Sequence, residues 1–335
     1  MKALVLHAPQ DYRYETAWPE PPTGRGWARV RVRFAGICGS DLPRFGEAGS
    51  YRHPMVLGHE FCGEVETCAR ESGRFKGGER VAVLPIVPCG RCEGCQVGPF
   101  HCRQYQFLGS RNDGGFAELC SVPEENLFRL PDAVDLRLGA LVEPLAVGLH
   151  AVQRSGFISG GAAMVLGAGP IGLVIALWLK AFGARRVAVA DVRPESLDLA
   201  RRCGAEEVID ARQWTPSDLR PFDVVFEAAG SRLALHHAIE AACRQGTVAV
   251  VGRDTQDTAL PLPLMERFMR KELTIRGCWG YDLRGEEPRL QRMIVTNQEA
   301  LSALITREVA LADAPAVIRQ MLERRFYYCK VLVRI

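Results

Sequence analysis

The segment Ala163-Met164-Val165-Leu166-Gly167-Ala168-Gly169-Pro170-Ile171-Gly172 decides the fold class of the chain. Its first four residues are apolar, as in a buried strand, and an apolar helical segment follows the glycines to about residue 182. Gly167 permits a tight turn, Gly169 lets the backbone approach a pyrophosphate, and Gly172 allows the helix to pack closely on the strand. With Pro170 and Ile171 at the start of the helix, where unpaired N–H groups attract phosphate, the segment predicts a dinucleotide site. The alternative is a turn that uses its glycines for geometry alone.

The residues after the next expected strands complete this cofactor site. Asp191 lies 19 residues beyond Gly172, where a carboxylate accepts hydrogen bonds from the ribose hydroxyls and repels a 2′-phosphate. This favours NAD over NADP, although Arg193 close by would attract such a phosphate. Loops after two later strands are expected to meet the nicotinamide half of the cofactor through main-chain atoms. Those loops contain Ala229, Val251 and Gly252.

Outward from this segment, strand-like and helix-like stretches alternate, which predicts a parallel, doubly wound sheet. We therefore expect an α/β fold with a Rossmann dinucleotide-binding domain over residues 151–285. Residues 1–150 contain short apolar runs separated by glycine and proline, as in a β-rich domain. Residues 286–335 are helix-like and end in an expected strand at 328–333.

The composition excludes several classes of protein. With 42 basic and 39 acidic residues the net charge is +3, which is too balanced for a nucleic-acid-binding protein. No apolar stretch reaches the roughly 18 to 20 residues needed to cross a bilayer, and the first residues lack the layout of a signal peptide. We therefore expect a cytoplasmic protein that binds neither nucleic acid nor membrane.

Four of the twelve cysteines form a C-x2-C-x2-C-x6-C cluster. Thiolates at this spacing wrap a zinc ion tetrahedrally, and four of them leave no open position, so the expected site is structural. An iron–sulfur cluster uses a similar spacing, but no other feature of the sequence suggests electron transfer. Disulfides are the third alternative and are disfavoured in a reducing cytoplasm. The cluster consists of Cys89, Cys92, Cys95 and Cys102.

Three further segments contain potential metal ligands. They are Gly36-Ile37-Cys38-Gly39-Ser40-Asp41, Gly58-His59-Glu60-Phe61-Cys62-Gly63 and Val142-Glu143-Pro144-Leu145-Ala146-Val147-Gly148-Leu149-His150. Taken singly, each has an ordinary structural explanation, because an isolated cysteine is more often a small buried apolar residue and an isolated histidine a hydrogen-bonded core residue. Their significance lies in their combination and their order along the chain.

In that order, with the four cysteines and the glycine-rich turn, these segments resemble the zinc-containing medium-chain dehydrogenases from end to end. The resemblance implies a GroES-like catalytic domain with a structural zinc lobe, a Rossmann domain, and a C-terminal segment that returns to the catalytic domain. It implies a catalytic zinc held by Cys38, His59 and Glu143, with Glu60 as a fourth or exchangeable ligand. Glutamate rather than cysteine at position 143 resembles the polyol dehydrogenase branch. Since the family forms dimers or tetramers, we expect a homo-oligomer.

Longer strings resemble the galactitol-1-phosphate 5-dehydrogenase subfamily. They are C-G-S-D-L-P-R from residue 38, F-L-G-S-R-N-D-G-G-F-A-E from residue 107 and R-K-E-L-T from residue 270. Two of them supply arginines, Arg44 and Arg111, that would suit the phosphate of a polyol phosphate, with pairing to surface carboxylates as the alternative. Two departures from the subfamily stand out, since the last gap of the cysteine cluster is one residue shorter and Cys68 replaces a glycine.

The resulting hypothesis is a zinc-dependent, NAD-linked oxidation of a secondary alcohol of a polyol or polyol phosphate to a ketone. A zinc ion with one exchangeable position lowers the pKa of the alcohol. Ser40 is placed to accept the hydroxyl proton, with a turn hydroxyl as its alternative role, and Asp41 to orient His59 through the second ring nitrogen. Sorbitol, an amino-cyclitol or threonine are alternative substrates. A non-catalytic NAD-binding relative is the remaining alternative, but such relatives lack the ligands present here.

Overall fold

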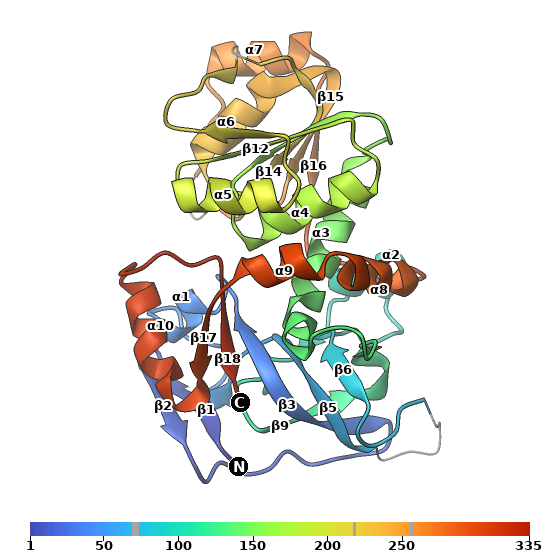
Figure 1. Ribbon diagram of the computed structural model, residues 1–335, viewed down its shortest axis with the longest axis vertical. Helices are drawn as coiled ribbons and strands as arrows, with labels where there is room; N and C mark the ends of the chain where they lie inside the picture. The colour runs from blue at the N-terminus through green and yellow to red at the C-terminus, as the bar shows by residue number, and fades with distance from the viewer. Residues whose placement is uncertain (69–73, 217–218, 255–256) are drawn as a thin grey trace. The chain divides into compact units, whose positions relative to one another are not determined.

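The chain forms two units in the computed structural model, which describes residues 1–68, 74–216, 219–254 and 257–335 (Figure 1). The first unit combines Met1–Glu143 with Arg284–Ile335, and the second is the continuous stretch Pro144–Leu283. The C-terminal part of the chain therefore completes the unit that the N-terminal part begins. Among the described residues, no helix combines the length and the apolar character that a bilayer span requires.

β3 (Trp27–Ile37) is the central strand of the first unit. It pairs antiparallel with β5 (Glu60–Cys68), β9 (Leu119–Pro123) and β18 (Lys330–Arg334), so strands from distant parts of the sequence share one sheet. The order of this sheet is β10-β6-β5-β3-β18-β17, with β9 beside β3. Apolar and charged residues alternate along β3, which buries Val30 and directs Arg31 to the surface, as a half-buried strand requires.

The other elements of the first unit are short. A second sheet has the order β2-β1-β4, and β7 pairs with β8. The remaining strands are β1 (Ala3–Ala8), β2 (Asp11–Glu15), β4 (Met55–Val56), β6 (Arg80–Val83), β7 (Ile86–Val87), β8 (Gln106–Phe107), β10 (Leu127–Arg129) and β17 (Ile305–Ala310). The helices are α1 (Leu42–Phe45), α2 (Glu93–Val97), α8 (Glu287–Thr296), α9 (Gln298–Leu304) and α10 (Ala314–Leu322), with 3-10 turns at Pro99–His101, Glu124–Asn126, Leu136–Leu141 and Leu311–Asp313. The helix α3 (Val142–Ser155) crosses the division between the units.

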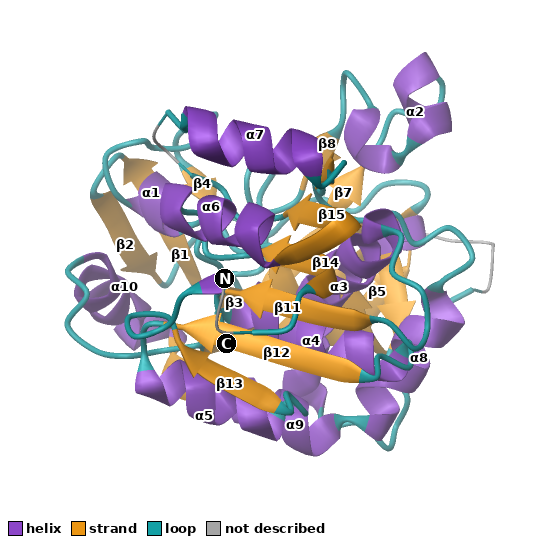
Figure 2. Cartoon of the chain, turned by 90° about the horizontal axis from the view of Figure 1, so that it is seen from above, coloured by secondary structure: helices purple, strands orange, loops and turns teal. Residues whose placement is uncertain are grey.

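The second unit has the parallel, doubly wound architecture that the strand–helix alternation predicts. Its six strands lie in the order β13-β12-β11-β14-β15-β16, and every neighbouring pair is parallel. Helices α4 and α5 cover one face of the sheet, and α6 and α7 lie on the other (Figure 2). The elements are β11 (Ala162–Leu166), α4 (Pro170–Ala181), β12 (Arg186–Asp191), α5 (Pro194–Arg202), β13 (Glu207–Asp210), β14 (Phe222–Glu227), α6 (Arg232–Ala241), β15 (Ala242–Val250), α7 (Leu262–Arg270) and β16 (Thr274–Gly277).

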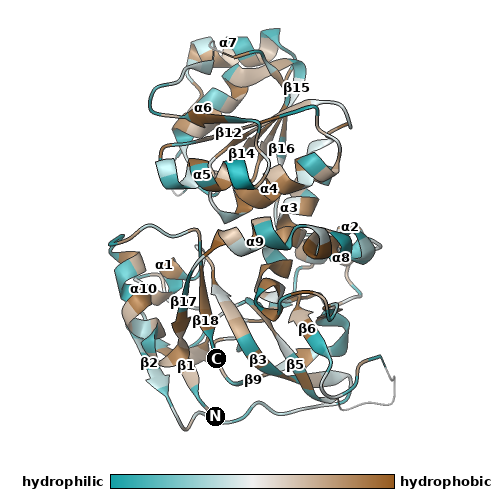
Figure 3. Cartoon of the chain, in the orientation of Figure 1, coloured by the Kyte–Doolittle hydropathy of each residue, from teal (hydrophilic) through white to brown (hydrophobic). Residues whose placement is uncertain are grey.

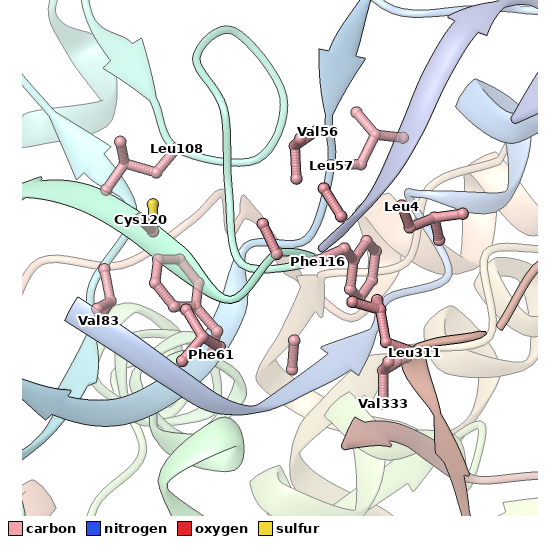
Figure 4. Packing of buried hydrophobic residues seen from close by; sticks show 14 of the residues in the cluster. Leu4, Val56, Leu57, Phe61, Val83, Leu108, Phe116, Cys120, Leu311 and Val333 are labelled. Carbon is pink, nitrogen blue, oxygen red and sulfur yellow. The ribbon is translucent and has the colours of Figure 1, made fainter. Parts of the chain in front are cut away.

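Each unit has its own apolar core. In the first unit, Leu311 and Val333 from the C-terminal part pack with Leu4 and Phe116 from the N-terminal part (Figure 4). In the second unit, α4 is hydrophobic along most of its length and almost wholly buried (Figure 3). A helix that is apolar on all sides has to lie inside a protein, which here fixes the glycine-rich turn before α4 firmly against the sheet.

Candidate metal and cofactor sites

The four cysteines of the cluster come together in a lobe between β7 and β8. The sulfur atoms of Cys89, Cys92, Cys95 and Cys102 all lie within 4.8 Å of one another. The Cys92 and Cys95 sulfurs are 3.5 Å apart, close to the roughly 3.8 Å between two thiolates that share a tetrahedral zinc ion. These distances are far too long for a disulfide, and all twelve cysteines, each in a described part of the chain, are free thiols.

Backbone N–H groups of the lobe donate hydrogen bonds to cysteine sulfurs, which favours the thiolate form. The N–H groups of Cys89 and Gln104 donate to the sulfur of Cys102 at 3.3 and 3.4 Å. Hydrogen bonds from backbone N–H groups, first that of Arg103 and then that of Cys95, lower the pKa of Cys92 to about 6. Burial and the neighbouring cysteine sulfurs raise the pKa of Cys95 to about 11, so this thiol would need the cation itself to become a thiolate. Since the thiolate is the form that binds metal, the lobe fits a structural zinc ion.

A second group of metal-binding side chains forms where β3 ends and β5 begins. Ligand atoms of Cys38, His59 and Glu60 lie within 4.8 Å of one another. Behind them, fully buried Asp41 places Oδ1 3.2 Å from His59 Nδ1, and its Oδ2 accepts the backbone N–H of Cys38 at 3.0 Å. Burial lowers the pKa of His59, but the charges of Asp41 and Cys38 outweigh it and raise the pKa well above the usual range. Because Asp41 occupies Nδ1, Nε2 is the nitrogen left for a metal.

Glu60 forms a buried ion pair with Lys330, a residue that the sequence did not point to. Lys330 Nζ, at the start of β18, donates to the two carboxylate oxygens of Glu60 at 2.7 and 2.5 Å, and both side chains are buried. The two strands flank β3, and the pair meets over Gly36, where a Cβ would overlap Glu60 Oε2. The available signal was a lysine directly before the apolar run Val331–Val333 of the strand K-V-L-V-R.

Glu143 lies near this group without being part of it. The structure brings together Cys38, His59 and Glu60 but leaves the Glu143 carboxylate outside the 4.8 Å group. Burial raises the pKa of Glu143 to about 7, with the charge of His59 opposing the shift and that of Glu60 adding to it. Glu143 therefore shares the electrostatic environment of the group and stands at the first turn of α3.

Three further expected residues lie in the same unit. Ser40 Oγ donates to the sulfur of Cys38 at 3.4 Å, and Arg44 donates to the backbone oxygen of Ser40 at 2.6 Å. The guanidinium of Arg111 lies between two tyrosine rings, 4.8 Å from the centre of Tyr51 and 4.2 Å from that of Tyr105. Within the described parts of the chain neither arginine forms a salt bridge with a carboxylate.

The glycine-rich turn of the second unit has the geometry that its sequence predicts. Gly167, with φ +103°, approaches the backbone of Ala229, and a Cβ at Gly172 would overlap the backbone oxygen of Gly167. A Cβ at Gly169 would meet nothing within 4 Å, so this side of the turn has room for a ligand. Pro170 and Ile171 open α4 as expected, and the turn fits a pyrophosphate at the helix N-terminus.

Asp191, at the end of β12, accepts a hydrogen bond from the backbone of the glycine-rich turn. Its Oδ2 accepts the N–H of Ala168 at 2.8 Å, and its Oδ1 accepts that of Arg193 at 2.9 Å. The Arg193 guanidinium lies 3.6 Å from the same carboxylate and is about half exposed. The two residues that bear on the choice between NAD and NADP are thus next to each other at the carboxyl end of the sheet.

Glu227, at the end of β14, organises the other expected cofactor loops and was missed by sequence reasoning. Its Oε1 accepts the N–H groups of Ala229 and Gly230 at 2.9 and 2.8 Å. Its backbone oxygen accepts those of Val251 and Gly252 at 2.9 and 2.8 Å. An acidic residue that ends a buried strand just before a glycine is the signal that points to such a role.

The chain is similar to proteins of known activity. Residues 24–132 match the model of the alcohol dehydrogenase GroES-like domain, and residues 170–296 that of the zinc-binding dehydrogenases. Sorbitol dehydrogenase of Bacillus subtilis is 36% identical over 295 residues, which cover 84% of this chain and 82% of the relative. Galactitol 1-phosphate 5-dehydrogenase of Escherichia coli is 35% identical over 259 residues, 75% of each chain. The crystal structure of galactitol-1-phosphate dehydrogenase from Escherichia coli matches with a TM-score of 0.93 at 30% identity and covers all of both chains.

Proposed function

The chain belongs to the zinc-containing medium-chain alcohol dehydrogenase family, and from this premise we propose that it oxidises a secondary alcohol of a polyol phosphate to a ketone with NAD as hydride acceptor. The coarser activity, an NAD(P)-dependent zinc alcohol or polyol dehydrogenase, follows from the family. Its zinc ions have two sites, the four-cysteine lobe and the cysteine–histidine–glutamate group. The observation that carries the proposal is this second group with Asp41 behind it.

Each residue of the cysteine–histidine–glutamate group has its own chemical role. A zinc ion bound there would act as a Lewis acid that lowers the pKa of the substrate hydroxyl. Cys38 and His59 would hold the ion, Glu143 would complete the set, and Glu60 would exchange with it. Asp41 keeps the His59 ring in its orientation, and Ser40, exposed beside Cys38, accepts the hydroxyl proton and passes it to solvent. The cofactor is the hydride acceptor, and Asp191 favours NAD.

The case for a phosphorylated substrate comes from the arginines. Arg44 and Arg111 are held in place, one by the Ser40 backbone and one by two tyrosine rings, yet neither has a carboxylate partner in the described residues. A guanidinium in this state retains N–H donors for a dianion. The 36% identity to a sorbitol dehydrogenase favours a free polyol as the second candidate substrate.

A substrate panel tests the proposal. The purified chain should oxidise galactitol 1-phosphate with a higher kcat/KM than galactitol or sorbitol, and NAD should be preferred to NADP. Arg44→Ala should lower kcat/KM for the phosphorylated substrate only. Equal losses on both substrates would remove the phosphate site, and near wild-type turnover by Cys38→Ser with the structural zinc present would remove the catalytic metal group.

We also propose a homo-oligomer in the cytoplasm. β16 ends the strand order of the second unit, and exposed apolar side chains lie on it and beside it. Such an edge is a template for pairing with a second copy. These side chains are Ile275 on the strand and Trp279 shortly after it. Free thiols throughout the chain suit a reducing compartment. Light scattering tests the assembly, because Ile275→Lys should yield monomers if β16 forms the interface.

A further inference from the structure

A row of aromatic rings leads from the four-cysteine lobe to the catalytic metal group within the first unit. The ring of Phe107 meets the ring of His59 edge to face, with 5.6 Å between centres and 60° between planes. Phe100, which belongs to the lobe, also contacts Phe107, with 6.0 Å between ring centres. Aromatic pairs at such distances prefer tilted arrangements like these and resist rotation out of them.

The fold of the lobe determines where Phe100 lies. Phe100 sits in the 3-10 turn Pro99–His101, directly before Cys102, whose backbone N–H donates to the oxygen of Pro99. Gly94 of α2 touches this turn so closely that a Cβ there would overlap the backbone oxygen of His101. Because the lobe is built around its four sulfurs, a metal ion bound to them fixes the turn and with it the ring of Phe100.

Phe107 is suited to transmit that position to His59. β8, which contains Phe107, pairs with β7, and the backbone oxygen of Phe107 accepts the N–H groups of the next turn, those of Ser110, Arg111 and Asn112, at 3.2, 2.9 and 3.1 Å. Its main chain is thus fixed, and its ring contacts the rings of both Phe100 and His59. Asp41 Oδ1 lies 3.2 Å from His59 Nδ1. The imidazole ring could still rotate about that contact, and Phe107 restricts this rotation.

Phe100 also has a second neighbour. Its ring is 6.2 Å from that of Tyr105, which in turn lies 4.2 Å from the guanidinium of Arg111. The same phenylalanine therefore contacts the ring that supports His59 and the ring that supports the arginine of the proposed phosphate site. Phe100 therefore links the Phe107–His59 contact to the Tyr105–Arg111 contact.

We propose that Phe100 is a positioning residue through which the structural zinc lobe sets the orientation of His59, and that Phe107 transmits it. The inference rests on the proposed role of His59 as a ligand of the catalytic metal. It assigns to the lobe an effect on the catalytic ion's ligand geometry, in addition to holding its own loop. The branch through Tyr105 extends the effect to Arg111.

The test is the spectrum of a Co²⁺ ion that replaces the catalytic zinc in the full-length protein. Phe100→Leu should shift the visible absorption bands of this Co²⁺ and weaken retention of the ion against a chelator by about tenfold, the lower end of the effect of a lost supporting contact. The structural zinc content should stay unchanged. Phe326→Leu is the matched control, because Phe326 is a half-buried ring beside Tyr328 that makes no ring contact with this row within the described residues. It should leave spectrum and retention as in the wild type.

Two further variants decide the remaining outcomes. If Phe100→Leu loses the structural zinc, Phe107→Leu, outside the cysteine cluster, must reproduce the shift, and a wild-type spectrum there overturns the proposal. The double variant should match Phe107→Leu alone, since Phe100 acts through Phe107, and additive effects would overturn the relay. A wild-type chain that binds no ion at the catalytic group would remove the proposed function itself. A different result is that the wild type binds Co²⁺ at the catalytic group while Phe100→Leu and Phe107→Leu keep its spectrum. That result would overturn this inference and leave the proposed function intact.

Discussion

Replacing Lys330 with methionine would remove the cation from the buried pair with Glu60 and keep the length of the side chain. Glu60 is 1% exposed and Lys330 2%. Burial lowers the pKa of Lys330, but the charges of Glu60 and Cys38 outweigh it and raise the pKa above the usual range, so the ammonium is charged at neutral pH. Since the folded-state pKa exceeds the unfolded value of about 10.4, the pair contributes fully at pH 7. Its contribution is lost only as the pH rises through the raised pKa.

The expected loss of folding free energy comes from leaving the Glu60 carboxylate in the interior without its ammonium partner. Removing one partner of a buried ion pair costs about 3–5 kcal/mol, a large part of the roughly 5–15 kcal/mol by which folded domains are stable. The double variant Glu60→Gln/Lys330→Met leaves no charge and should recover at least about 2 kcal/mol of that loss. Lys180→Met is the matched control, because Lys180 pairs with Glu206 at the surface and should cost less than about 1 kcal/mol.

Amide hydrogen exchange is the suitable assay, because it reads each unit separately. With the catalytic zinc removed, Lys330→Met should lower the opening free energy of β3, β5 and β18 by about 3–5 kcal/mol. Amides of β11 and β12 in the second unit serve as the internal reference and should not change. A decrease below about 1 kcal/mol, or a double variant that opens as easily as the single one, would refute the reasoning. With zinc present the loss should be smaller, because Glu60 can then turn to the metal.

Changes at three other positions have definite expected outcomes. Gly36→Ala places a Cβ against Glu60 and should destabilise the chain by about 1–3 kcal/mol in thermal unfolding, whereas Gly24→Ala, where a Cβ meets nothing within 4 Å, should not. Glu227→Ala should cost about 1–3 kcal/mol, because backbone N–H groups lose their acceptor. Burial raises the pKa of Glu227, so ionisation of this carboxyl makes the wild type less stable as the pH rises from about 4.3 towards the raised pKa. Glu227→Gln should therefore gain stability relative to the wild type over that interval. Cys92→Ser should reduce the zinc content from about two ions per chain to about one, and an unchanged metal analysis would contradict the four-cysteine site.

The features predictable from the sequence are those encoded locally. The glycine-rich turn lies between a short apolar strand and an apolar helix, so its role follows from ten consecutive residues, and the parallel sheet follows from the alternation around it. The four cysteines are likewise close in sequence. The structure also uses local signals at element boundaries: Ser231 caps α6 by accepting the N–H of Ala234, and β15 begins at Ala242, directly after α6.

Contacts between distant residues were beyond sequence reasoning. Glu60 and Lys330 are 270 positions apart, and they meet only because β5 and β18 flank β3. The approach of Phe107 to His59 likewise depends on how a lobe folds back on the sheet, which no periodicity reveals. Glu143 shows the converse, since a resemblance placed it among the ligands and the structure leaves it just outside their group.

The position of β18 has a consequence for synthesis on the ribosome. The continuous second unit, Pro144–Leu283, is complete as a nascent chain before Lys330–Arg334 has been made, so it can fold while the first unit still lacks a strand. Until that strand arrives, the Phe34–Ile37 end of β3 lacks its β18 partner, and the Glu60 carboxylate has no ammonium partner. The part of the protein translated first is therefore the last to mature, and chaperones would find their binding surface there.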